Sequence, residues 1–483
     1  MVASGLEALA GRATYELQCV SYPARPWVQS RTHDGEHVHS VVIVGGGQSG
    51  TAIAFGLMRE RVLDVVVLDR NPAGQEGPWS TYARMHTLRT PKTVTGPDLG
   101  IPSLSVRSWY EARFGVQAWE KLDKIPRDLW HEYLLWVRNT VGITIRNGAE
   151  VFDIEPVAAG VLAVHVRETK NGGKPYRLLT RKIVLATGIE GSGGWRVPKL
   201  ISTSLPRERY AHTADPIDFS KLTGKRIAVL GAGASAFDNA AVALEHGAAS
   251  VDLLVRRPEI PRINPNRWIE FAGFMRHFGD LSDEMKWRFM WKYFDLNQPP
   301  PQDTYDRCGR FENFRIHVAS PLTHAAESNG EIVLTTPGAS HHADFMIVGT
   351  GHVIDFDTRP ELQRIKHQIG LWKERYTPPG SETNEALGNY PYLGSSGQFT
   401  ERVPGSAPHL RDITCFTYAA MLSLAHAAGI SQLKFGVERI VTGITHDFFV
   451  DDAEAYFAAL CAYDELDLTR TTLQSCPRTS RVA

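Results

Sequence analysis

The feature that most constrains the fold of this chain is a glycine-rich turn that joins a buried strand to a helix and that occurs twice. The first copy begins with the continuous apolar run Val41–Val44, which is typical of a parallel strand covered on both faces. The turn GGGQSG at 45–50 follows, then a helix with apolar residues at helical spacing, and then a second apolar strand, Val65–Leu68. This order predicts a strand-helix-strand unit of a parallel sheet.

The second copy has the same order of elements about one domain later. The strand 226–230 leads into the turn GAGASA at 231–236, a helix, and the strand Val251–Val255. Two more apolar strands end in Thr-Gly turns, ATG at 186–188 and GTG at 349–351. We therefore expect an α/β protein with two Rossmann-like dinucleotide-binding domains, the second inserted into the first.

The positions of these motifs suggest domain boundaries. We expect an N-terminal extension at 1–38, the first part of one domain at 39–198, the inserted domain at 199–351, and the return of the first domain with C-terminal helices at 352–483. Within the inserted domain, 259–325 is rich in aromatic residues and too long for a plain connection. We favour a local satellite core for this stretch, because aromatic residues at helical spacing usually pack; a lid or substrate wall is the alternative.

Composition excludes several classes of protein. Lys+Arg (52) nearly equals Asp+Glu (53), so no overall charge favours nucleic acid or an anionic membrane as a partner. The five cysteines are widely spread with no C-x-x-C pair, which speaks against a disulfide framework and a thiolate zinc site, and we expect no bound metal. No stretch approaches the roughly 18 apolar residues of a membrane span. We expect a cytoplasmic protein. The sequence is compatible with a homo-oligomer.

The first turn matches the pattern G-x-G-x-x-G, in which the three glycines provide a tight turn, close approach to a pyrophosphate and close helix packing. The pyrophosphate would lie at the helix N-terminus, where free N–H groups and the helix dipole favour an anion. Asp69, at the end of the second strand, lies where an acid accepts a hydrogen bond from a ribose hydroxyl. The cofactor-binding residues assigned to this unit are Gly45, Gly47, Gln48, Ser49, Gly50 and Asp69.

The second unit differs in two respects. Its third motif position is Ala236, which the motif tolerates, and its second strand ends in Arg256 and Arg257 instead of an acid. Guanidinium groups pair with a 2′-phosphate, so this unit is expected to bind NADPH rather than NADH; a solvated arginine pair is the alternative. The cofactor-binding residues assigned here are Gly231, Gly233, Ser235, Arg256 and Arg257.

Two dinucleotide sites in one chain imply hydride transfer from NADPH to a bound flavin, for which FAD is the usual partner of a first unit ending in an acid. A disulfide reductase would need a redox cysteine pair, which the spacing of the cysteines does not provide. Dioxygen is then the expected electron acceptor, with a quinone or a protein as the alternative.

Together the turns GGGQSG, ATG, GAGASA with its trailing arginines, and GTG resemble those of the class B flavoprotein monooxygenases, over about residues 40–450. The resemblance implies that NADPH reduces FAD, that O2 adds at flavin C4a, and that the resulting C4a-(hydro)peroxyflavin oxygenates a small soft nucleophile or a carbonyl. Gly188 and Gly351, in the two Thr-Gly turns, are accordingly assigned to the nucleotide sites.

One departure bears on the subclass. The Baeyer-Villiger fingerprint requires Phe, Gly and Trp around a histidine, but this chain has Pro206, Glu208 and Pro216 at those positions around His212. This difference speaks against lactone or ester formation. We interpret His212 as a linker residue that makes structural hydrogen bonds rather than as a base.

The segment 77–92 resembles the family region that passes beneath the flavin ring, and Trp79 is expected to stack near it. Where related enzymes of the flavin-containing type often have an asparagine, this chain has Arg89 and Lys92, our candidate catalytic residues. They would stabilise an anionic peroxide or bind a substrate carboxylate, and surface cations are the alternative. Ser431 resembles the N-cap of the last flavin-contacting helix; an ordinary capped helix is the alternative.

The sequence thus predicts an FAD-containing, NADPH- and O2-dependent monooxygenase of a small molecule. An amine nitrogen is the favoured site of oxygenation, because the Baeyer-Villiger fingerprint is broken and because Arg89 and Lys92 could hold the carboxylate of an amino-acid-like substrate. Baeyer-Villiger or sulfur oxygenation, and an NADPH-dependent flavin reductase without oxygenation, are the alternatives.

Overall fold

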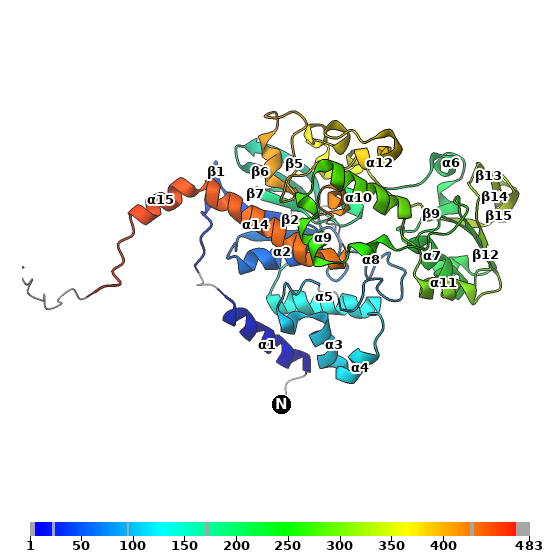
Figure 1. Ribbon diagram of the computed structural model, residues 1–483, viewed down its shortest axis with the longest axis horizontal. Coiled ribbons are helices and arrows are strands. Elements are labelled where there is room, and N and C mark those ends of the chain that lie inside the picture. The colour runs from blue at the N-terminus through cyan, green and yellow to red at the C-terminus, as the bar shows by residue number, and fades with distance from the viewer. Residues whose placement is uncertain (1–4, 22–24, 94–95, 170–172, 426–428, 470–483) are drawn as a thin grey trace, which may run out of the picture.

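A computed structural model describes residues 5–21, 25–93, 96–169, 173–425 and 429–469 of the 483-residue chain. Figure 1 shows a larger body that carries α2 and α14 beside a smaller body that carries α7 and α11. Each body has its own sheet with a parallel strand-helix-strand unit, as the two glycine turns predict; the sheet of the larger body is mixed, because β5, β6 and β7 pair antiparallel. We call these the first domain and the inserted domain.

The sheet of the first domain has eight strands and is built from both ends of the chain. Its strands run in the order β4-β3-β2-β7-β6-β5, with β1 antiparallel beside β2 and β18 parallel beside β7. Because β18 follows the inserted domain, the returning chain completes the sheet that the N-terminal part begins. The strands are β1 (Arg31–His33), β2 (Glu36–Val44), β3 (Val65–Asp69), β4 (Arg146–Asn147), β5 (Ala149–Ala158), β6 (Val161–Glu168), β7 (Tyr176–Leu185) and β18 (Ile413–Cys415).

Two helices far apart in sequence cover one face of this sheet. The first, α2 (Gln48–Arg59), follows the glycine turn, and the second is α14 (Leu433–Asp451). Their apolar residues share a buried core with β2, which includes Ile43, Leu57 and Ile440. This packing fixes the N-terminus of α2 at the carboxyl ends of the parallel strands, where ligands bind in open α/β sheets.

A helical layer lies below α2 in Figure 1. It consists of α1 (Gly5–Cys19), α3 (Val106–Phe114), α4 (Val116–Lys121) and α5 (Arg127–Val141). The helix α1 of the N-terminal extension packs against α3 and α5.

The inserted domain has a five-stranded, fully parallel sheet in the order β12-β11-β10-β16-β9. Helix α7 (Ala234–Glu245) packs on one face together with α11 (Gln302–Gly309), and the three-stranded sheet β13-β14-β15 packs on the other. The strands are β9 (Tyr210–His212), β10 (Arg226–Leu230), β11 (Ser250–Leu254), β12 (Phe314–His317), β13 (His324–Ser328), β14 (Glu331–Thr336), β15 (Ala339–Ala343) and β16 (Phe345–Val348).

The inserted domain begins and ends at one pair of strands. It leaves the first domain along β8 (Gly193–Trp195) and returns along β17 (His352–Ile354), and these two strands pair antiparallel. The prediction that one dinucleotide-binding domain is inserted into the other is therefore confirmed.

The aromatic-rich stretch 259–325 is not one local unit. Helices α8 (Pro265–Ile269), α9 (Ala272–His277) and α10 (Asp283–Leu296) pack against the returning part of the first domain, where Trp287 and Met290 share a buried cluster with Trp372 and Met421. The rest of the stretch, α11 and β12, belongs to the inserted domain. The satellite core that the sequence predicts is therefore shared with a distant segment instead of local.

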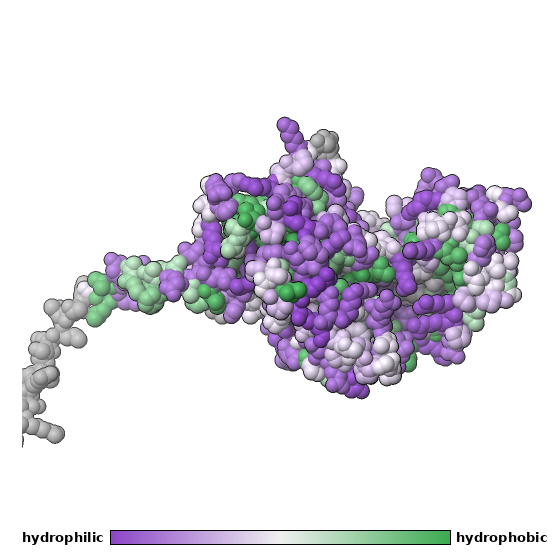
Figure 2. All heavy atoms as spheres, turned by 90° about the horizontal axis from the view of Figure 1, so that it is seen from above, coloured by the Kyte–Doolittle hydropathy of each residue, from purple (hydrophilic) through white to green (hydrophobic). Residues whose placement is uncertain are grey.

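The C-terminal helix α15 (Ala453–Cys461) projects from the body of the first domain (Figure 1). Its large apolar residues are exposed, and Figure 2 shows apolar atoms along this projection. None of the helices in the described ranges is long and apolar enough to cross a membrane. The remaining short helices are α6 (Lys199–Ser202), α12 (Glu385–Gly388) and α13 (Met421–Leu424).

Candidate active site

The first glycine turn has a backbone conformation that residues with a side chain could not adopt at two of its positions. Gly45 has a φ of +104°, and a Cβ there would lie 2.5 Å from the carbonyl oxygen of Ala186. A Cβ on Gly50 would lie 1.8 Å from the carbonyl oxygen of Gly45. By contrast, the nearest atoms to a Cβ on Gly47 would be 3.8 Å away, on Gly77. The turn is therefore tight on its protein side and open at its middle glycine, as close approach of a ligand requires.

The N-terminus of α2 has no side-chain cap. Its N-cap residue is Gly47, which has no side chain to accept a hydrogen bond from the first N–H groups of the helix. Those groups and the positive end of the helix dipole together suit a pyrophosphate.

Asp69 connects the end of β3 to the glycine turn. One carboxylate oxygen accepts a hydrogen bond from the backbone N–H of Gly46 at 2.8 Å, and the other accepts one from Asn71 at 2.8 Å. Burial raises the pKa of Asp69, although both hydrogen bonds act in the opposite direction. The carboxylate thus fixes the turn to the second strand. That it also accepts from a ribose hydroxyl stays a prediction.

Two buried polar atoms near this turn have no partner among the described residues: the indole Nε1 of Trp79 and the hydroxyl of Thr187. Thr187 follows Ala186, whose carbonyl faces Gly45. Trp79 packs edge-on against Trp130, whose own Nε1 donates to the side chain of Gln48 at 3.4 Å. A buried donor without an acceptor costs about 1–3 kcal/mol, so these atoms call for a bound molecule that carries polar groups. Together with the uncapped helix they fit a dinucleotide such as FAD.

A cleft beside the turn contains charged residues that the sequence did not single out. Gly47 and Gln48 line it together with Glu76 and Arg138. Arg138 donates to the buried Glu76 carboxylate at 2.8 Å, and Asn147 donates to the same oxygen. No motif marks these residues, because their partners are about 60–70 positions away in the sequence.

The second glycine turn repeats the geometry of the first. Gly231 has a φ of +132°, and a Cβ there would lie 2.2 Å from the carbonyl oxygen of Gly349. Gly233 is the N-cap of α7, without a side-chain cap and with open space around it. Ser235, in the first turn of α7, is exposed. This helix N-terminus therefore also offers free N–H groups to an anion.

The two arginines after β11 differ in their surroundings. Arg256 is exposed, whereas Arg257 is half-buried and donates to the backbone oxygen of Asp295 at 3.3 Å. Arg256 is therefore the better placed of the two to meet a 2′-phosphate. Gly188 follows β7 and Gly351 follows β16. Their φ values are +68° and +78°, so both are turn residues in the left-handed region of the backbone.

Arg89 and Lys92 have partners that the sequence did not predict. The ammonium of Lys92 donates to the carbonyl oxygens of Trp119 at 2.7 Å, Leu122 at 2.5 Å and Glu120 at 3.4 Å, so all three of its donors are engaged at the end of α4. In the structure, Lys92 therefore caps the C-terminal carbonyls of α4 and does not act in the predicted catalytic role.

Arg89 pairs across the domain boundary. Its guanidinium donates to the carboxylate of Asp238 on α7 at 2.5 Å, and Asp238 is only 2% exposed. Its Nε is buried and has no partner among the described residues. The charge of Arg89 is neutralised by this ion pair, so it is not free to hold a substrate carboxylate as the sequence suggests.

Ser431 is not the N-cap of the last long helix, contrary to the sequence prediction. The N-cap of α14 is Gln432, and Ser431 lies in a short 3-10 turn, Ile430–Gln432, that precedes it. Ser431 instead hydrogen-bonds to the side chain of Glu270, at the end of α8; burial raises the pKa of Glu270, against the effect of this hydrogen bond. Ser431 therefore faces the aromatic segment that joins the two domains.

Two histidines, the buried His212 and the half-buried His352, lie at the connection between the domains. The Nε2 of His212 donates to the carbonyl of Gly351 at 3.0 Å, its Nδ1 accepts from the backbone N–H of Ala214 at 3.2 Å, and its ring stacks on Trp195. Burial lowers the pKa of His212, which keeps it neutral. His212 thus makes the structural hydrogen bonds of a linker residue. Burial and the nearby His212 lower the pKa of His352 to about 4.

Comparisons with known proteins identify the class. Residues 42–190 match the family described as FAD-NAD(P)-binding. The fold resembles that of an ornithine hydroxylase from Pseudomonas aeruginosa, with a TM-score of 0.66, 18% identity, and coverage of 85% of this chain and 99% of that one. It also resembles an ornithine N-hydroxylase from Kutzneria sp. 744 in a complex with reduced FAD, NADP+ and L-ornithine, with a TM-score of 0.63, 18% identity, and 85% and 99% coverage. At this identity, both likenesses concern the fold.

A sequence relative is more informative. The chain is 44% identical over 455 residues, which are 94% of this chain and 95% of the relative, to a protein of Xanthomonas campestris pv. campestris described as a FAD-dependent urate hydroxylase. The chain therefore belongs to the family of FAD-dependent monooxygenases that includes this hydroxylase. It is a flavin-dependent oxidoreductase, and the prediction of FAD and NADPH as its cofactors is confirmed at the level of the family.

Proposed function

We propose that this enzyme is an NADPH- and O2-dependent flavin monooxygenase that hydroxylates urate or a closely related oxopurine. The observation that carries the proposal is the 44% identity to the hydroxylase from Xanthomonas campestris over 94% of the chain. A match of this length leaves few residues outside it. It therefore takes in both dinucleotide units and the helices α8 and α9 within the inserted range.

The contacts of the two predicted catalytic cations support an oxopurine over an amino acid. The sequence-based preference for an amine nitrogen depends on Arg89 and Lys92 as holders of a substrate carboxylate. Lys92 already donates to three carbonyls, and Arg89 is paired with the buried Asp238. A substrate carboxylate would have to displace the carbonyls from Lys92 and would share the charge of Arg89 with Asp238. N-hydroxylation of an amine therefore becomes the alternative that the same assay tests.

When bound, FAD supplies the activation of oxygen and NADPH supplies the hydride. The residues of the chain bind and orient both groups. The first turn and the N-terminus of α2 would hold the FAD pyrophosphate, and the unpaired Trp79 and Thr187 would donate to the flavin nucleotide. The N-terminus of α7 and Arg256 would hold NADPH.

We assign the substrate side to the segment α8–α9. Trp268 and Phe271 are 58% and 50% exposed there, and Glu270 lies between them in the sequence and bonds to Ser431. Exposed aromatic faces beside a carboxyl and a hydroxyl suit a planar heterocycle that carries polar edges.

An assay with the FAD-loaded enzyme tests the proposal. Urate and xanthine are compared with L-ornithine and L-lysine while NADPH oxidation and H2O2 release are measured, and the product is analysed after reaction under 18O2. We expect urate to accelerate NADPH oxidation with little H2O2 and to gain one labelled oxygen. Label in ornithine or lysine instead would establish N-hydroxylation, and electron delivery to a quinone without labelled product would establish a reductase.

A variant pair tests the assigned substrate side. Trp268→Ala should raise the KM for urate about 3- to 10-fold, because ring stacking contributes about 0.5–1.5 kcal/mol, while the FAD content stays unchanged. Phe457→Ala, which removes a 64% exposed ring from α15, is the control and should leave KM unchanged. An unchanged KM in Trp268→Ala would remove this segment from the substrate site.

A further inference from the structure

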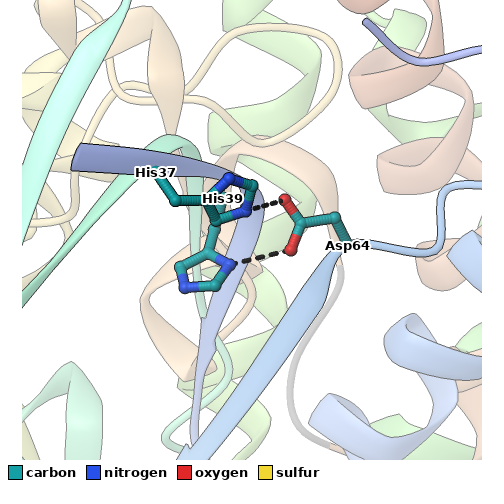
Figure 3. A group of neighbouring side chains, drawn as sticks. All are labelled: His37, His39 and Asp64. Carbon is teal, nitrogen blue, oxygen red and sulfur yellow. Dashed lines mark hydrogen bonds and ion pairs between the residues drawn. The ribbon is translucent and has the colours of Figure 1, made fainter. Parts of the chain in front are cut away.

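Two histidines and one aspartate converge at the edge of the first domain that is opposite to the glycine turn. His37 and His39 are two residues apart on β2, so their side chains lie on the same face of the sheet. Asp64 lies in the turn just before β3, the strand that pairs with β2. Figure 3 shows both imidazole rings directed at its carboxylate.

The distances bring three ligand atoms together. The Nε2 of His37 is 2.9 Å from one oxygen of Asp64, and the Nδ1 of His39 is 2.8 Å from the other. All three groups offer an atom within 4.8 Å of the other two. The backbone N–H of Ser40 donates to the carboxylate at 3.1 Å and so fixes its orientation, as hydrogen bonds to metal-binding carboxylates do.

From these contacts we propose that His37, His39 and Asp64 bind one divalent transition metal ion, for which zinc is the best match. Two imidazole nitrogens and one carboxylate are a typical zinc donor set, and solvent can supply the fourth ligand. Bonds of about 2.0–2.1 Å in a tetrahedral arrangement separate ligand atoms by roughly 3.3 Å. To bind an ion with this spacing, the side chains must turn away from their present hydrogen bonds to the two carboxylate oxygens. The ring nitrogens that face the carboxylate must also give up their protons, to the solvent or to the other nitrogen of the same ring.

The site is open to the solvent and separate from the redox chemistry. The side chain of His37 is 51% exposed and that of Asp64 is 38% exposed, so an ion has an entry path. His39 and Gly45 are six residues apart along an extended strand, which corresponds to roughly 20 Å. The metal would therefore act as a clip that joins the hairpin β1–β2 to the turn before β3, and not as a catalytic centre.

A second cluster provides an internal comparison. Asp252, His317 and His341 also meet the distance condition for a metal site. There, however, only His317 bonds to the carboxylate, at 2.7 Å, while the Nε2 of His341 lies 3.5 Å from the hydroxyl of Thr336. In the first cluster both histidines come from one strand and both point at the same carboxylate, so we assign the metal to that cluster.

Zinc titration of the FAD-loaded full-length enzyme tests the assignment. After removal of metals with a chelator, calorimetry with ZnCl2 and elemental analysis should give one zinc per chain. His37→Ala and the isosteric Asp64→Asn should each weaken binding at least about tenfold. Because His37 is half exposed, its replacement leaves the core intact.

Two controls separate this site from unspecific binding. His165→Ala removes a strand histidine that bonds to Glu155 at 2.8 Å. Among the described residues this pair is not part of a three-ligand cluster, so the variant should leave zinc binding unchanged. His317→Ala, in the second cluster, should also leave it unchanged. Zinc should raise the melting temperature of the wild type but not that of His37→Ala. Equal zinc binding by the wild type, His37→Ala and Asp64→Asn, or loss of zinc in His317→Ala alone, would overturn the proposal.

Discussion

The two dinucleotide units of this enzyme solve the same packing problem in two ways. In each unit, the first glycine lies close to a backbone carbonyl just after the strand that pairs with the first strand of the unit. This carbonyl belongs to Ala186 after β7 in the first unit and to Gly349 after β16 in the second. The third motif position is Gly50 in one unit and Ala236 in the other. A Cβ on Gly349 would lie 2.7 Å from the Cβ of Ala236.

The second unit has an alanine on the helix, and its close neighbour after the sheet strand is a glycine, Gly349. In the first unit the constraint at the third motif position lies inside the turn itself, because a Cβ on Gly50 would meet the carbonyl oxygen of Gly45 at 1.8 Å. The same motif position is therefore limited by a different neighbour in each unit.

The units also differ after their second strands. Asp69 turns inward and binds two backbone N–H groups, while Arg256 extends into the solvent. The first unit thus uses its acid to build the turn, and the ribose contact predicted for the same acid stays a prediction. The second unit leaves its cation free for a phosphate.

The largest effect is expected from Gly50→Ala, because the new Cβ would lie 1.8 Å from a backbone oxygen that cannot move aside. We expect more than about 3 kcal/mol of lost stability and a loss of bound FAD, measured by thermal unfolding and the flavin-to-protein absorbance ratio. Gly47→Ala, where space is open, should fold normally and affect FAD alone. Normal FAD content in Gly50→Ala would show that the first turn tolerates a Cβ at this position.

The pairing in the second unit should appear in a double-mutant cycle. Gly349→Ala should destabilise the enzyme by about 1–3 kcal/mol through its clash with Ala236, and Ala236→Gly should remove most of that effect in the double variant. Urea unfolding of the four proteins measures the coupling. Additive effects would show that the two positions are independent.

Acid should weaken the connection between the units at His352. In the unfolded chain this histidine takes up a proton as the pH falls through about 6.5, whereas the folded chain resists protonation until about 4. The unfolded state therefore binds more protons in this window, so stability present above pH 6.5 is lost as the pH falls toward 4, by up to about 3 kcal/mol. Urea unfolding of the wild type and His352→Gln at pH 7 and pH 4.5 measures this contribution, and equal pH dependence would contradict it.

At the arginines that follow β11, an effect on cofactor affinity without a loss of stability is expected. Arg256→Ala should raise the KM for NADPH about 10- to 100-fold with little change for NADH, because a charge-assisted hydrogen bond contributes about 1.5–3 kcal/mol. Arg257→Ala should have a smaller effect, since its side chain already donates to Asp295. An equal loss for both cofactors would show that Arg256 does not meet the 2′-phosphate.

The sequence predicts those parts of the molecule whose causes are local. Gly45 and Gly231 can be predicted from the sequence because a positive φ and a nearby carbonyl oxygen admit only glycine at these positions. In addition, each turn follows a strand with a continuous apolar run. The first residue of a helix is harder to predict. Ser431 has a side chain typical of an N-cap, but a short 3-10 turn precedes α14, so Gln432 is the N-cap of that helix.

Partners that are distant in sequence were not predictable. Lys92 looks like a free cation until the fold brings the carbonyls at the end of α4 to it. Trp287 looks like part of a local core until the returning chain places Trp372 beside it. In both cases the deciding contact depends on tertiary packing that one sequence does not encode as a pattern.

The pairing of β8 with β17 bears on how this fold could be engineered. Because the strands that enter and leave the inserted domain lie side by side, residues 196–351 begin and end at adjacent points of the first domain. A domain with neighbouring termini can be exchanged at such a junction without rerouting the host chain. Here the replacement module would have to keep helices α8–α10, because Trp287 and Met290 complete a buried cluster with Trp372 and Met421 of the first domain.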